Sequence, residues 1–351
     1  MSRRARRWLI ALAVLALLFL AALGLAWFMA QPQRLVPLLL GRAGAELGLE
    51  LRIDGRPEYA LRPEPRLVLP GFSATLPGET DPILRAERVE LALPWATLRS
   101  GGADLAITRI VLVAPDADLP GIRRWLAARP ESDAGLRLPT LREGLRVERG
   151  RLRDEGWAID GLDLDLPFLA EGAPARLRAS GTWVDGEARR AFAADLAATP
   201  FLADGRFALE KLALDLRGES PLPTLRAEGR AAYGEQVELA LAGALADWPA
   251  DWPALPEALP ASDAPVAFEA HYAGALALDA PLALKVERGD TAAEAELAVP
   301  ALRAWLDAGM PEPLPPLRGR LVTPRLEFGG VVLHGVEARI EDDATEDADG
   351  R

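Results

Sequence analysis

Cysteine is absent from this 351-residue chain, and histidine occurs only as His271 and His334. Without thiols the chain forms neither disulfides nor thiolate metal sites, so folding depends on its apolar core. Both histidines lie in alternating segments without neighbouring ligands at metal-site spacing, and we interpret them as surface residues. Phosphate-binding glycine loops and nucleophile elbows are also missing. We therefore expect no enzyme, no cofactor and no metal.

Acidic residues outnumber basic residues beyond the N-terminus. The formal net charge is −12, and because the four N-terminal arginines contribute +4, the rest of the chain carries about −16. A body with this charge is repelled by phosphate backbones, so we expect no nucleic-acid partner.

One long apolar run is present, Trp8–Ala30, and it follows Arg3, Arg4, Arg6 and Arg7. A helix of this length reaches roughly 33 Å, enough to cross a hydrocarbon core of about 30 Å. The alternative is a cleaved signal peptide, whose apolar core is usually shorter and ends in small residues. We therefore predict an uncleaved anchor that keeps the arginines in the cytoplasm and sends the remaining chain across the membrane.

Beyond the anchor, Leu35–Leu47 has helical spacing, which predicts a short helix. It either packs on the end of the body or lies in the membrane interface. From Leu49 the apolar period becomes two, as in strands with one apolar and one polar face. Glycine and proline separate a dozen or more such segments. We predict a mainly β fold: an N-terminal transmembrane helix followed by an elongated, curved antiparallel amphipathic sheet with a few short helices.

The predicted apolar face includes three strands that we select as candidates for lining a groove. The candidates are Leu162, Leu164, Leu166, Leu212, Leu214, Leu216, Val336, Ala338 and Ile340. A single sheet of a dozen to sixteen strands would extend roughly 60–75 Å. The alternative for the same residues is an ordinary core between two packed sheets, which is the default arrangement of alternating strands, and the sequence does not separate the two interpretations.

Helical segments are predicted at 119–129 and 299–310, and the proline-rich stretch 247–265 is predicted to be an extended connection. It either divides two sheets or loops out of one. We divide the chain into an anchor (1–30), an N-terminal region (31–130), a β-rich middle (131–246), the connection (247–265), a β-rich C-terminal region (266–341) and an acidic disordered tail (342–351).

A motif near the start of the exported part carries a family resemblance. Gly55, Tyr59, Pro63, Pro65 and Leu67 form a G-x3-aromatic-x3-P-x-P-x-L pattern behind the anchor and the first strand. This order resembles the start of AsmA-family proteins of the Gram-negative envelope, and residues 297–341 are similar to their C-terminal region. The resemblance implies a single-pass inner-membrane protein whose periplasmic part is a curved sheet lined with apolar residues. Related larger proteins are thought to pass phospholipids along such a groove.

Three functions remain for the chain. The first is to shield or move lipid acyl chains in an apolar β-groove, with the inner membrane and a phospholipid or other acyl-chain lipid as partners. The second is an envelope scaffold that binds outer-membrane or secretion proteins through strand edges. The third, which we disfavour, is a hydrolase that uses Asp163 and Asp165, because two carboxylates on one strand are usually just its solvated face.

Overall fold

The computed structural model describes residues 40–340 except 42, 46, 100–105, 129–137, 204–205, 235, 250, 253–258, 261, 276–278, 309–315 and 329–330. The described part is mainly β, as the alternating segments predict. Its N-terminal strands are β1 (Glu50–Ile53), β2 (Glu58–Ala60), β3 (Arg66–Thr75), β4 (Pro82–Ala92), β5 (Ala106–Ile107), β6 (Arg109–Val113), β7 (Asp116–Asp118), β8 (Thr140–Leu141) and β9 (Leu145–Arg153).

Eleven further strands follow in the described part of the chain. They are β10 (Trp157–Leu166), β11 (Ala175–Asp185), β12 (Ala188–Ala203), β13 (Arg206–Gly218), β14 (Leu225–Tyr233), β15 (Val237–Leu245), β16 (Val266–Gly274), β17 (Pro281–Arg288), β18 (Thr291–Ala298), β19 (Arg318–Phe328) and β20 (Val331–Ile340). The helices are α3 (Trp95–Arg99), α4 (Leu119–Ala128) and α5 (Val299–Asp307).

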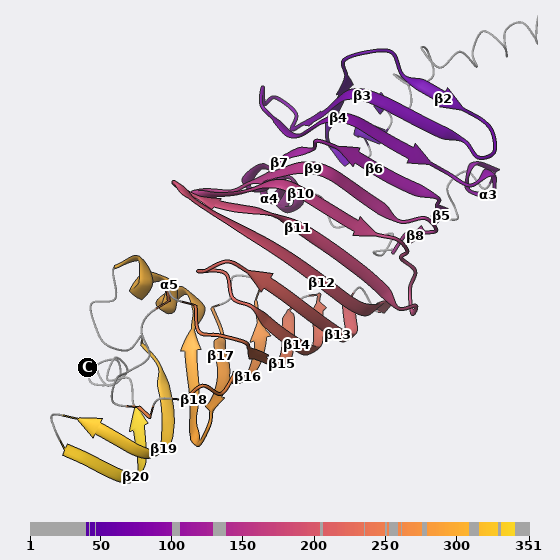
Figure 1. Cartoon of the computed structure of the whole chain (residues 1–351). Coiled ribbons are helices and arrows are strands. Elements are labelled where there is room, and N and C mark those ends of the chain that lie inside the picture. Colours follow the sequence, from indigo (N-terminus) through magenta and orange to yellow (C-terminus); the bar gives the residue numbers. More distant parts are fainter. Residues whose placement is uncertain are drawn as a thin grey trace, which may run out of the picture.

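All of these strands except β5 and β8 belong to one 18-stranded sheet (Figure 1). The strands occupy 16 rows, since β1 and β2 both pair with β3, and β6 and β7 both lie between β4 and β9. At about 4.8 Å per row the sheet is about 70 Å long. From β9 to β20 each strand pairs with the next one in sequence, and β1 and β20 lie at opposite ends of the body.

The prediction of a purely antiparallel sheet is wrong at one place, because β9 runs parallel to β6 and β7. The chain leaves β7, forms α4 and returns beside the strands it left, and such a crossover brings it back in the same direction. Asp118 starts this helix: its Oδ2 accepts a hydrogen bond of 2.9 Å from the backbone N–H of Gly121. The large sheet is therefore mixed, with β5 and β8 forming a second, parallel pair.

Helix α4 covers part of the N-terminal strands. It packs on β4 and β7, and the backbone of Gly121 lies so close to β4 that an added Cβ would be 2.5 Å from Cγ2 of Ile83. Ile83 is only 4% exposed, and Leu69 on the neighbouring strand β3 is 6% exposed. The N-terminal part of the sheet thus has a closed core.

The predicted segments outside the sheet have mixed outcomes. The described residues between 40 and 47 are helical, α4 covers the described part of the predicted 119–129, and α5 occupies the first part of the predicted 299–310. Among the described residues, no helix is long and apolar enough to cross a membrane. The predicted anchor Trp8–Ala30 with its arginines, and the predicted tail 342–351, lie outside the described residues.

Candidate functional site

The sheet from β9 to β20 has a continuous face of small and apolar residues, which we call the apolar face. Directly opposed residues of neighbouring strands point to the same side of a sheet, so the face can be followed through the register. One line across it runs Val147, Leu164, Ala179, Ala194, Leu216, Leu225, Leu245 and Val266, then from Phe268 through Val286, Ala293 and Leu321 to Ala338. Eleven strands beyond β9 therefore present one apolar surface.

All nine groove candidates lie on this face. Leu162, Leu164 and Leu166 oppose Gly150, Val147 and Leu145 of β9, while Leu212, Leu214 and Leu216 oppose Gly229, Ala227 and Leu225 of β14. Val336, Ala338 and Ile340 oppose Thr323, Leu321 and Gly319 of β19. Leu212 is buried and the other eight are half-buried. The structure thus joins three distant sequence segments in one surface.

Little of the described chain covers the apolar face. The strands from β10 to β17 pack mainly on their hydrogen-bonded neighbours, whereas α4 contacts β4 and β7 and α5 contacts β18. A closed sandwich would bury most of these side chains, because a second sheet would lie about 10 Å away across an apolar layer. Half-buried leucines across several neighbouring strands are instead typical of a single layer.

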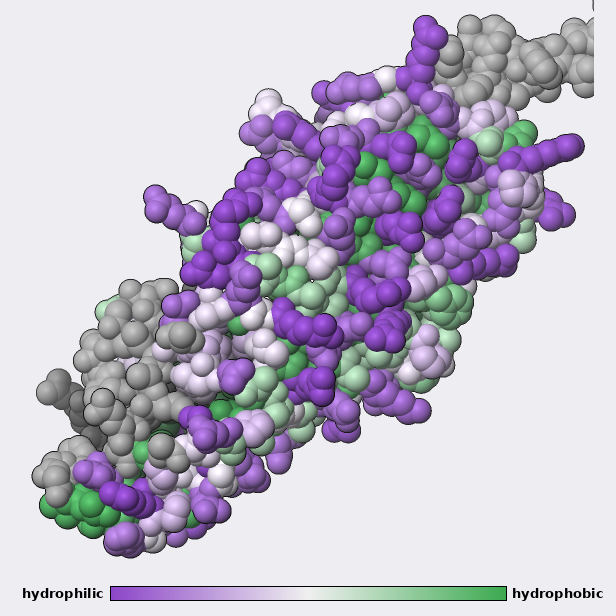
Figure 2. Space-filling view, viewed as in Figure 1, coloured by the Kyte–Doolittle hydropathy of each residue, from purple (hydrophilic) through white to green (hydrophobic). Residues whose placement is uncertain are grey.

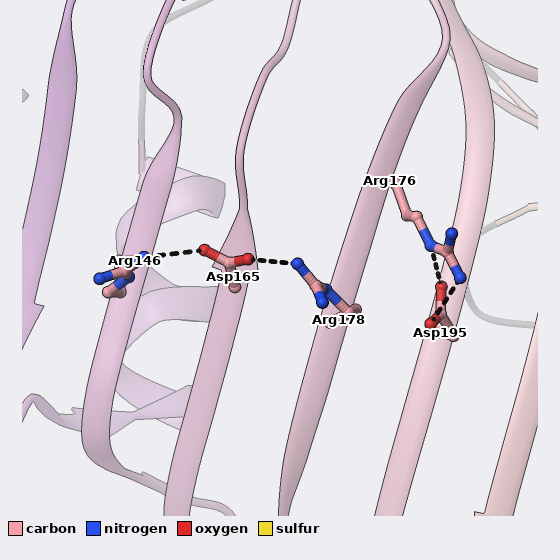
Figure 3. A network of polar contacts seen from close by, with 5 residues as sticks. All are labelled: Arg146, Asp165, Arg176, Arg178 and Asp195. Carbon is pink, nitrogen blue, oxygen red and sulfur yellow. Dashed lines mark hydrogen bonds and ion pairs between the residues drawn. The ribbon is translucent and has the colours of Figure 1, made fainter.

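The opposite side of the same strands, which we call the charged face, carries rows of ion pairs. Asp165 binds Arg146 at 3.5 Å and Arg178 at 3.0 Å, and Asp195 accepts two hydrogen bonds from Arg176 (Figure 3). Hydrogen bonding from Arg176 lowers the pKa of Asp195. In Figure 2, hydrophilic side chains predominate where β9–β13 face the viewer. These cross-strand pairs keep one side of the sheet compatible with water.

The charged face also explains Asp163 and Asp165. Both lie on it, but Asp163 accepts a hydrogen bond of 2.9 Å from the backbone N–H of Arg149, and Asp165 is shared between two arginines. Arg149 has a left-handed backbone (φ 55°) beside an irregularity in the β9–β10 pairing, which aims its N–H at that carboxylate. In this arrangement Asp163 is a hydrogen-bond acceptor for the backbone and Asp165 is an ion-pair partner of two arginines.

The histidines and the family-motif residues lie elsewhere. His271 on β16 and His334 on β20 are exposed and belong to different strands. Among the described residues, no cluster of three or more His, Cys, Asp or Glu side chains could hold a metal ion. Gly55, Tyr59, Pro63, Pro65 and Leu67 surround the β2–β3 hairpin; Pro65 is buried and Tyr59 is 41% exposed. They lie at the β1 end of the sheet, away from the nine candidates.

A cavity of about 730 Å³ lies on the apolar face over β14–β19. Its floor includes Leu245, Phe268, Leu284, Val286 and Leu321. Its other wall is formed by Trp248, Trp252, Leu259 and Pro260 from the predicted connection, which we call the Trp cap. Because β15 pairs with β16 over nine residues, the connection loops out of one continuous sheet and turns back over its apolar face.

The Trp cap was missed at the level of sequence. The proline content of 247–265 indicates an extended connection, but its contact with the sheet depends on residues far away in sequence. Two tryptophans four positions apart in a proline-rich segment were the only signal, since large aromatic side chains are seldom left fully in water.

Searches against protein-family models, curated proteins and solved structures found no match to this chain.

Proposed function

We propose that the protein is a non-enzymatic, AsmA-type envelope protein that shields or moves lipid acyl chains along its apolar face. The observation that supports this most is the continuous apolar face of β9–β20, over which the described chain places little besides the Trp cap. An amphipathic sheet must cover such a face with protein or with hydrocarbon. The sequence-predicted anchor would hold one end of the body at the inner membrane, with the sheet in the periplasm.

The length of the sheet limits how the function would be carried out. Sixteen rows extend only about 70 Å, so we propose that the chain works beside the inner membrane or passes lipid to a partner. The charged face stays in water, and the acyl chains lie on the opposite side. Each acyl-chain methylene that leaves water contributes about 0.8 kcal/mol to the free energy of binding. A few half-covered leucines per strand are therefore enough to bind an acyl chain weakly, so that it can slide along the face.

The test is a pair of single substitutions on β13, made in the full-length chain. Leu214 lies on the apolar face opposite Leu196 and Ala227, while its neighbour Ala213 lies on the charged face opposite Ala197 and Glu228. After extraction in mild detergent, native mass spectrometry should find phospholipid on the wild type and on Ala213→Asp. Leu214→Asp should remain folded and carry less lipid than Ala213→Asp. Unfolding of Leu214→Asp alone would indicate a closed core, and a lipid-free wild type would exclude the proposal.

A second candidate function, an assembly scaffold, is favoured by the C-terminal strand. The described part of the chain has no strand on the outer side of β20, and Val331, Val332 and Leu333 are 59%, 39% and 46% exposed. Figure 2 shows a hydrophobic cluster at that end of the molecule. Exposed apolar edge strands favour strand addition by another chain. A photo-crosslinker at Val331 would then capture a protein, and crosslinkers at Leu214 would capture no lipid.

A further inference from the structure

The Trp cap is attached to the sheet at its N-terminal side. Nε1 of Trp252 donates a hydrogen bond of 2.8 Å to the carbonyl oxygen of Pro221, and the backbone N–H of Asp251 donates one of 3.1 Å to Oγ of Ser220. Both acceptors belong to the β13–β14 turn. The ring of Trp248 meets that of Trp252 edge to face, with centroids 5.1 Å apart. The two rings therefore form one rigid aromatic wall.

The connection is also attached where it re-enters the sheet. Arg288, the last residue of β17, donates hydrogen bonds to the carbonyl oxygens of Ser262 and Ala264. Arg288 also lines the cavity, and these bonds use two of its five N–H donors. The residues on either side of the cavity are thus fixed to different turns of the sheet, by bonds that do not involve the apolar floor.

The cavity between these attachments suits hydrocarbon. Apart from Arg288, the polar side chain in its wall is Thr291, whose Oγ1 is hydrogen-bonded to Oγ1 of Thr323 at 3.0 Å. The other thirteen lining residues are apolar or aromatic. The volume of about 730 Å³ lies in the range of small-molecule sites. Leu216 opposes Leu225 of the cavity wall, so the floor continues without interruption onto the uncapped apolar face of β13.

We propose that the Trp cap forms a retention site for one hydrocarbon chain of a lipid, which lies between the cap and β14–β19 with its headgroup outside. This rests on the proposed function and adds that lipid is held at one place on an otherwise open face. The occupant is hydrocarbon, because thirteen of the fifteen residues that line the cavity are apolar or aromatic.

Tryptophan quenching by 9,10-dibromostearate tests the site in the full-length chain in amphipol. The chain has 9 tryptophans, so the emission of the cap is the difference between the wild type and Trp248→Phe/Trp252→Phe. We expect dibromostearate to quench this difference emission by at least half, and stearate to leave it unchanged. Native mass spectrometry on the same samples reports whether the probe is bound at all.

The outcomes separate the two proposals. Bound probe with unquenched cap emission overturns the retention site and leaves the apolar-face function standing. If no probe binds to either protein, both are overturned.

An engineered disulfide offers a second measurement, since the chain has no cysteine of its own. A Cβ built on Gly289 would lie 3.9 Å from Cβ of Ser262, within the range that a disulfide needs. In Ser262→Cys/Gly289→Cys, oxidation fastens the connection to the β17–β18 turn. We expect release of preloaded dibromostearate to slow at least tenfold on oxidation and to recover on reduction. Equal release rates in the two states would overturn retention under the cap.

Discussion

The two ends of the sheet differ in how their apolar side chains are covered. Up to β9 one crossover is parallel and α4 lies on β4 and β7; this part holds ten of the 17 buried hydrophobic residues. From β10 onward the strands are antiparallel, and most apolar-face leucines are half-buried. The comparison shows that alternation along a strand specifies an amphipathic sheet, whereas the presence of a covering helix decides whether that sheet encloses a core.

A buried charge should separate the two regions most strongly. Ile83→Asp places an unpaired carboxylate under α4 and should destabilise the protein by about 3–5 kcal/mol, unfolding the N-terminal strands. Leu214→Asp, on the uncovered face, should cost less than half as much because water reaches the carboxylate. Urea unfolding followed by circular dichroism measures both, with Ile83→Val as the conservative control. Equal destabilisation would mean that the apolar face is closed.

Truncation of one leucine in each region gives an intermediate effect. Leu69 is 6% exposed in the closed core, and Leu69→Ala should cost about 2–5 kcal/mol. Leu164 is half-buried on the apolar face, so Leu164→Ala should cost about 1 kcal/mol, since only part of its surface leaves water on folding. The difference in free energy of unfolding is the quantity to compare. Losses of similar size would contradict the single-layer description.

The smallest expected effect concerns pH. Hydrogen bonding from Arg176 lowers the pKa of Asp195 from its ordinary value of 3.8, so the pair stabilises the folded state fully above that pH. The contribution disappears as pH falls through the lowered native pKa. Asp195→Asn should flatten the stability profile in this acid range, and Arg176→Gln should raise the native pKa of Asp195 in an NMR titration. An unchanged pKa in Arg176→Gln would show that the ion pair does not form in solution.

Sequence reasoning was strongest where structure is local. The alternation of Leu212, Leu214 and Leu216 is enough to predict a strand and to place these side chains on one face, because the side-chain period of a strand is two. Pro120 and the helical spacing of the apolar residues after it likewise predict α4, because both are local features of the sequence. In contrast, the parallel return of β9 follows from where α4 packs, and β7 is only three residues long, too short for a periodic signal.

The candidate site shows the same division. The pairing of the strands brings Leu164, Leu214 and Ala338 into one surface. The two-residue period predicts that each lies on the apolar side of its own strand, but it does not predict the order of the strands. The Trp cap depends on contacts between Trp252 and Pro221, 31 positions apart, and between Arg288 and Ser262, 26 positions apart. Such contacts between distant residues leave no periodic mark in the sequence.

Because each strand of β9–β20 pairs with the next one in sequence, the length of the sheet can change without altering the rest of the fold. Because each strand is stabilised mainly by the two beside it, the region behaves as a one-dimensional array, in which energy is a sum over adjacent units. Insertion or deletion of one hairpin would change the reach by about 10 Å while leaving every other interface in place. A chain built this way can be lengthened or shortened by duplication or loss of single hairpins, a route that is closed to a protein folded around one central core.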